Sequence, residues 1–175
     1  HEPAEVNQYT SFIGNIMASR ISSQWDFSGP AFTLSAEENS TFKALETAQM
    51  MLANGEVDAV VVGAVDLAGS VENVLLRHQQ APVNSGVPTM SLDQNANGWL
   101  IGEGAGVVVL KRNEDAVQNQ DRVYAVIDTI AIVQGAGPEP TAERVAQAAR
   151  QALAEQGILP SDVGFLELFG SGVAA

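Results

Sequence analysis

The sequence of 175 residues contains no cysteine and only two histidines, His1 and His78. The absence of cysteine excludes disulfide bonds, thiolate metal ligands and thiol nucleophiles. Only these two residues could supply an imidazole, so most of the common catalytic machinery is missing. We therefore expect no metal site and no cofactor.

Basic charge and long apolar runs are also scarce. There are 8 lysines and arginines against 21 acidic residues, which gives a net charge of −13, and no basic cluster could neutralise a phosphate backbone. No uncharged apolar run of 18 or more residues occurs, and the start does not resemble a signal peptide. We expect no nucleic-acid partner, no membrane span and a cytoplasmic protein.

The remaining composition, 46% hydrophobic, is sufficient for the core of one ordinary domain. Apolar spacing predicts helices at about Val6–Ser23, Ser40–Ala53, Val71–Gln80 and about Thr141–Gln156. Strands are predicted at Phe32–Ser35, Val57–Val65, 104–112, 122–135 and Val163–Phe169, with a loop at 81–98 and a helical turn or loop at 113–121. Alternating helices and strands predict a layered α/β fold.

Two details of strand packing follow from these patterns. The run Val57–Val65 is almost continuously β-branched, which is typical of a strand covered on both faces and connected to Phe32–Ser35 by a right-handed crossover. Segments 104–112 and 122–135 are expected to pair as neighbours because only a short connection separates them.

Segments 29–65, 91–112 and 160–172 carry motifs that together resemble the β-ketoacyl synthases, the condensing enzymes of fatty acid and polyketide assembly. GPAFTLSAEENSTFKALETAQMMLANGEVDAVVVGAV (29–65) resembles the strand, nucleophile helix and following strand of that family. SLDQNANGWLIGEGAGVVVLKR (91–112) resembles the segment after the family's loop, and PSDVGFLELFGSG (160–172) resembles the strand that carries its first catalytic histidine. The resemblance implies the thiolase fold, a layered α-β-α architecture, present here as an incomplete fragment. Residues 1–112 would be part of the N-terminal half of the domain, and 113–175 the beginning of its C-terminal half.

The departures from the family pattern concern the catalytic centre. Glu38 stands at the position of the family's cysteine, and Phe169 stands at the position of its histidine. Condensation needs a nucleophile that carries an acyl group as a thioester, and N–H donors that stabilise an enolate. A glutamate and a phenylalanine supply neither, so we expect no catalytic residue in this chain.

This set of losses, with the triplet Ala36-Glu37-Glu38, resembles the chain-length-factor group, the inactive partners of true ketosynthases in polyunsaturated fatty acid and polyketide synthases. The resemblance implies a non-catalytic domain that pairs with an active ketosynthase and shapes the acyl pocket. It also implies an interface at the strand before the nucleophile position, formed by Ala31, Phe32, Thr33, Leu34 and Ser35. Acyl carrier proteins are generally acidic, so we expect the carrier to dock mainly on the ketosynthase.

An alternative function is a malonyl-thioester decarboxylase in which Glu38 keeps a proton through burial beside an apolar surface or Glu37. A simpler interpretation is that both carboxylates complement a helix N-terminus, where Glu38 would accept backbone N–H bonds. Asp93 and Glu103 are expected to hold loops by hydrogen bonds. The glycine-rich run 102–106 is expected to serve tight packing, since no P-loop lysine follows it.

Overall fold

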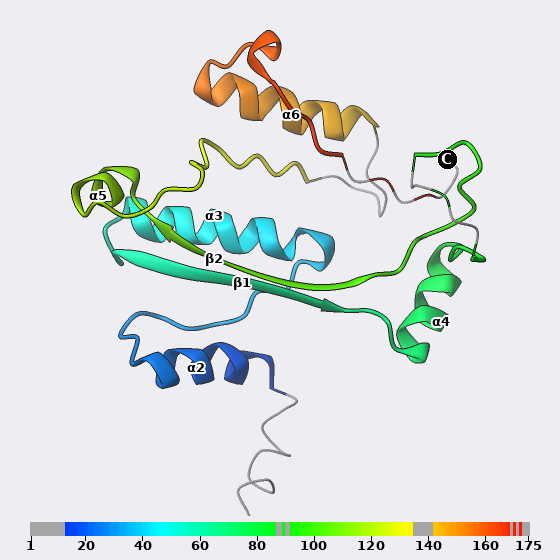
Figure 1. Cartoon of the computed structure of the whole chain (residues 1–175), viewed down its shortest axis with the longest axis horizontal. Coiled ribbons are helices and arrows are strands. Elements are labelled where there is room, and N and C mark those ends of the chain that lie inside the picture. The colour runs from blue at the N-terminus through cyan, green and yellow to red at the C-terminus, as the bar shows by residue number, and fades with distance from the viewer. Residues whose placement is uncertain are drawn as a thin grey trace, which may run out of the picture. The chain divides into compact units, whose positions relative to one another are not determined.

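The computed structural model describes residues 13–86, 89, 92–134, 142–168, 170 and 172. The helices are α2 (Gly14–Trp25), α3 (Ser40–Ala53), α4 (Val71–Gln80), α5 (Asn113–Gln118) and α6 (Ala142–Gln156). The strands are β1 (Ala59–Leu67) and β2 (Glu103–Lys111), and two short 3₁₀ helices are η1 (Glu37–Asn39) and η2 (Pro160–Asp162) (Figure 1). Helices and strands are both present, as the sequence predicts.

The helix predictions are confirmed. Helices α3 and α4 have the predicted bounds, and the described part of α6 ends at Gln156 as predicted, while Thr141 lies outside the described residues. Residues 6–12 of the first predicted helix lie outside the described residues. Ile13 is extended, contrary to the prediction, so the described helix begins at Gly14, and it ends at Trp25, two residues later than predicted. Gly55 follows α3 with φ +69°, and Gly157 follows α6 with φ +65°. This left-handed conformation is accessible to glycine at little cost, which is why these two residues end their helices.

Strands β1 and β2 run antiparallel as neighbours in a two-stranded sheet (Figure 1). β1 begins and ends two residues later than predicted. The two strands are in close contact at Gly63, where an added Cβ would lie 3.7 Å from the Val107 side chain of β2. The predicted pairing of 104–112 with 122–135 is wrong, because β2 pairs with β1 instead. Strand partners depend on which segments meet in space, and a short connection only raises the chance of pairing.

Three predicted strands are not formed within the described residues: Phe32–Ser35, 122–134 and 163–168 carry no strand assignment. The predicted crossover from Phe32–Ser35 to β1 is therefore also wrong for this structure. A strand needs a neighbour for its backbone groups. In the first of these segments the Thr33 amide donates instead to the Asn15 side-chain oxygen of α2, at 2.9 Å.

The described chain forms two compact units. The first contains the residues up to Val62 and Val109–Val126, and the second contains Gly63–Val108 and the residues from Ile127 onward. Buried apolar side chains are contributed to the first unit by Ala48, Leu52, Val62 and Ala116, and to the second by Ala68. The boundary at 112/113 between the two family halves stays a prediction.

Strand β1 is not covered on both faces, contrary to expectation. Val61, Val65 and Leu67 are exposed, and Val62 is the buried β1 residue in the part of the chain that the structure describes. A sheet of two strands offers too little surface to bury both of its faces.

None of the helices in the described ranges is long and apolar enough to cross a membrane.

Candidate functional site

Glu38 lies in η1, in the sharp turn between the irregular segment 31–36 and the start of α3. Ser40 fixes this turn with one hydroxyl. Its Oγ accepts the Ala36 amide at 2.9 Å and donates to the Glu37 carbonyl at 2.6 Å, while the Asn39 amide donates to the Ala36 carbonyl at 3.0 Å. These bonds hold Glu37 at φ +52°, a left-handed conformation that glutamate rarely adopts.

The Glu38 carboxylate is exposed and has no hydrogen-bond partner among the described residues. The expectation that it accepts backbone N–H bonds at the start of α3 is therefore wrong in this structure, because no side-chain oxygen caps that helix. Its place just before α3 is still favourable for a negative charge. Phe169, predicted to stand at the position of the family's histidine, lies outside the described residues.

The predicted interface segment is accessible in this chain. Phe32, Thr33, Leu34 and Ser35 are exposed, and Ala31 is half-buried. The side chain of Asn15 receives hydrogen bonds from the amide and the hydroxyl of Thr33, both at 2.9 Å. The segment is therefore held from one side by α2, and its role as an interface stays a prediction.

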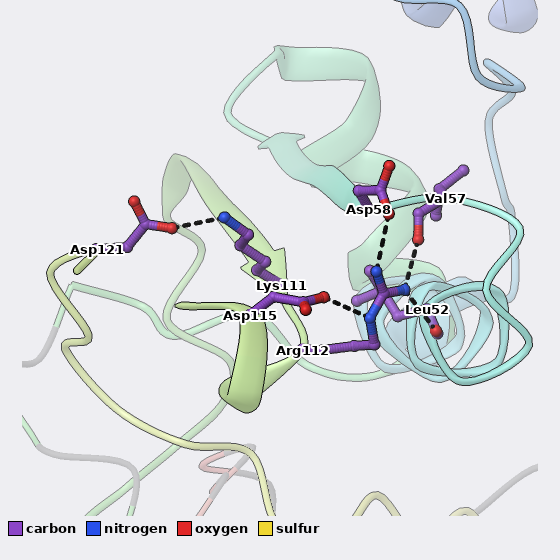
Figure 2. A network of polar contacts seen from close by, with 7 residues as sticks. All are labelled: Leu52, Val57, Asp58, Lys111, Arg112, Asp115 and Asp121. Carbon is purple, nitrogen blue, oxygen red and sulfur yellow. Dashed lines mark hydrogen bonds and ion pairs between the residues drawn. The ribbon is translucent and has the colours of Figure 1, made fainter. Parts of the chain in front are cut away.

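Sequence reasoning missed the polar network around Arg112, which follows β2 (Figure 2). Its Nη1 donates to the carbonyls of Leu52 and Val57, both at 2.9 Å. Its Nη2 donates to Asp58 at 2.8 Å, and its Nε donates to Asp115 at 2.5 Å. The hydrogen bonds to Asp58 and then Asp115 raise the pKa of Arg112 above its already high ordinary value. The spacing of Arg112 and Asp115 was a visible signal for part of this network.

In the described part of the chain, the neighbouring Lys111 takes part in a single ion pair, with Asp121. Lys111 Nζ lies 2.7 Å from Asp121 Oδ2, and both side chains are separate from the guanidinium network (Figure 2). This pair offers a matched control for experiments on Arg112.

In the second unit, the two carboxylates expected to hold loops do so. Glu103 Oε1 accepts the Gly69 amide at 3.0 Å, and Asp93 Oδ1 accepts the Asn95 amide at 2.8 Å. The prediction that the glycine-rich run serves tight packing is wrong. A Cβ added at Gly102, Gly104 or Gly106 would meet no atom within 4 Å in the described structure. A strand edge and loop with so few neighbours leave these glycines in open space.

His78 is exposed in the last turn of α4. Its Nδ1 accepts the Val83 amide at 3.2 Å, so it also helps to hold the following loop.

Within the described ranges, no group of three or more histidine or acidic side chains could hold a metal ion.

Residues 1–116 match the family model described as the N-terminal domain of β-ketoacyl synthase, and the chain belongs to this family.

Particular relatives refine the comparison. The chain is 43% identical over 161 residues to a polyunsaturated fatty acid synthase protein of Thraustochytrium sp., a match that covers 91% of this chain and 7% of that protein. The solved structure named PfaC Keto synthase-Chain length factor is 46% identical, with a TM-score of 0.83, over 95% of this chain and 17% of that one. The oxazolomycin ketosynthase domain OzmH KS7 of Streptomyces albus has a TM-score of 0.84 at 29% identity, over 91% of this chain and 29% of that one.

These comparisons confirm the ketosynthase family and the thiolase-like layered fold, present as a fragment of the domain. The chain spans less than a tenth of the length of the curated relative and less than a third of either solved structure.

Proposed function

We propose that this chain is part of a non-catalytic, chain-length-factor-like domain that pairs with an active β-ketoacyl synthase in fatty acid or polyketide assembly. The observation that carries the proposal is the exposed Glu38 at the start of α3, in a sequence without any cysteine. Its likeness to a structure whose name contains both a ketosynthase and a chain length factor supports the same role.

The chemistry of Glu38 explains why condensation is not expected. A thioester is reactive toward carbon nucleophiles yet stable in water, whereas an acyl group on a carboxylate would be a mixed anhydride that water hydrolyses. The side chain of Phe169 has no N–H group with which to stabilise an enolate. The domain is proposed to act instead by shaping the acyl pocket and by stabilising the ketosynthase pair.

The segment 31–35 is the proposed contact with the ketosynthase. Its side chains are mostly exposed, and the structure assigns no strand partner to it within the described ranges. An extended segment of this kind offers backbone donors and acceptors to a neighbouring chain, and pairing would remove an edge that otherwise invites aggregation.

Charge supports carrier docking on the ketosynthase. Five cations lie in ion pairs with carboxylates, namely Lys43, Arg77, Lys111, Arg112 and Arg150. Arg122 lies 4.7 Å from the ring centre of Tyr124, and the two remaining arginines, Arg20 and Arg144, also have partners. With its cations engaged and a net charge of −13, this chain would repel an acidic carrier.

The test compares Glu38→Gln, Glu38→Ala and the matched control Glu37→Gln in the assembled complex. Since Glu38 is exposed and has no hydrogen-bond partner in the described structure, we expect all three to keep the product yield and chain-length distribution close to those of the wild type. Glu38→Cys is expected not to restore condensation, because Phe169 still replaces the required imidazole.

The same variants discriminate the decarboxylase alternative, which needs a buried, protonated Glu38. Release of carbon dioxide from malonyl-loaded carrier protein is measured for each complex. If Glu38→Gln abolished product formation or decarboxylation while the complex stayed assembled, Glu38 would have a chemical role and the non-catalytic proposal would be rejected.

A further inference from the structure

Helix α3 is anchored at the end that lies away from Glu38. Within the described residues, the hydrogen bond that reaches α3 from a distant part of the sequence ends on the Leu52 carbonyl, in its last turn, and comes from Arg112. The contacts of Ser40 at the other end involve neighbours in the sequence, Ala36 and Glu37. The C-terminal end of α3 is thus fixed by tertiary structure, and the N-terminal end by a local turn.

The guanidinium of Arg112 joins three elements at once (Figure 2). Through Leu52 it satisfies a carbonyl at the end of α3, where backbone acceptors lack helical partners. Through Val57 and Asp58 it holds the chain that leads into β1, and through Asp115 it holds α5. A planar fork with several donors can satisfy these directions together, which a lysine ammonium on a flexible stem cannot.

We infer that Arg112 is the positioning residue of the candidate site: by fixing the last turn of α3 against β1 and α5, it sets where Glu38 and the segment 31–36 lie. Helix α3 has 14 residues and is about 20 Å long, so a displacement of its last turn is carried along a stiff rod to its first turn. The inference rests on the proposed function, because the segment before α3 is there the contact with the ketosynthase, and its position helps to shape the acyl pocket.

The experiment uses the assembled complex with Arg112→Met, Arg112→Lys and the control Lys111→Met. The control removes a neighbouring cation whose described ion pair is with Asp121 alone. Product chain lengths are measured below the unfolding temperature of every variant, and size-exclusion chromatography verifies assembly. Because small displacements of positioning groups have large effects on reactions, we expect Arg112→Met to change the ratio of the main products about twofold or more. Arg112→Lys is expected to give an intermediate ratio, and Lys111→Met the wild-type ratio.

A purely structural role would lower the unfolding temperature without changing the ratio. An assembled Arg112→Met complex with the wild-type ratio would therefore overturn the inference. If that variant fails to fold, Arg112→Lys and Asp115→Asn, which removes one arm of the network, are judged by the same criterion. Failure of the proposed function is recognised separately, because the wild-type chain would then neither bind a ketosynthase nor alter its products.

Discussion

Replacing Gly98 by alanine is expected to open the contact between residues 82–84 and 98–99 in the second unit. The Trp99 amide donates to the Pro82 carbonyl and the Asn84 amide donates to the Trp99 carbonyl, both at 2.9 Å. Gly98 has φ +145°, and its amide donates to the Gly172 carbonyl at 2.9 Å. A Cβ at this position would lie 2.6 Å from the Pro82 oxygen and 2.7 Å from the Asn84 nitrogen.

The magnitude follows from two costs. A non-glycine residue held at such a φ costs about 1–3 kcal/mol. The atoms that a Cβ would meet belong to the backbone and cannot rotate away, so relief would break one or two hydrogen bonds, at about 0.5–1.5 kcal/mol each. We expect Gly98→Ala to lower the free energy of unfolding by about 1.5–6 kcal/mol, the sum of these two costs.

Gly102→Ala is the matched control, because a Cβ there would meet no described atom within 4 Å. That change should be neutral or stabilise by about 0.5 kcal/mol through the unfolded state. Denaturant unfolding gives the free energies, and amide hydrogen exchange of Asn84 and Trp99 reports local opening. If Gly98→Ala matched Gly102→Ala in unfolding and in exchange at both amides, the steric argument would be refuted.

Three further predictions concern pH and partners. Hydrogen bonds from Thr129 Oγ1 at 2.5 Å and then from Gln151 at 3.0 Å lower the pKa of Glu155 below its ordinary 4.5. A lowered carboxyl pKa stabilises the fold above pH 4.5, and this stabilisation is lost as the pH falls through the pKa of the folded state. The loss of stability caused by Thr129→Val should therefore be largest at neutral pH and shrink in acid. A loss of stability that stayed constant with pH would contradict this. Phe32→Asp, in the segment 31–35, should weaken association with the ketosynthase in sedimentation experiments, and a complex in which this segment faces solvent would refute the interface. Charge reversal of basic residues should reduce carrier affinity more on the ketosynthase than on this chain, and the opposite order would place carrier docking here.

The sequence alone determined the helices and the family. Helices α3 and α4 were predicted with their observed bounds, because their apolar spacing and the stop at Gly55 are local properties of the chain. The family could be recognised from ordered motifs, and the predicted departure at Glu38 was read from one of them. The loop contacts of Asp93 and Glu103 were also anticipated.

Tertiary structure alone decided which strands form and what they contact. The segment 122–134 has strand-like composition but no strand in the described structure, while β2 pairs with β1, more than 35 residues earlier in the chain. Backbone pairing needs a second segment in space, which periodicity does not specify. The network of Arg112 could not be predicted for the same reason. Two of its acceptors are backbone carbonyls, 60 and 55 residues away in the sequence. Every residue has a backbone carbonyl, so only the fold decides which of them lie next to the guanidinium.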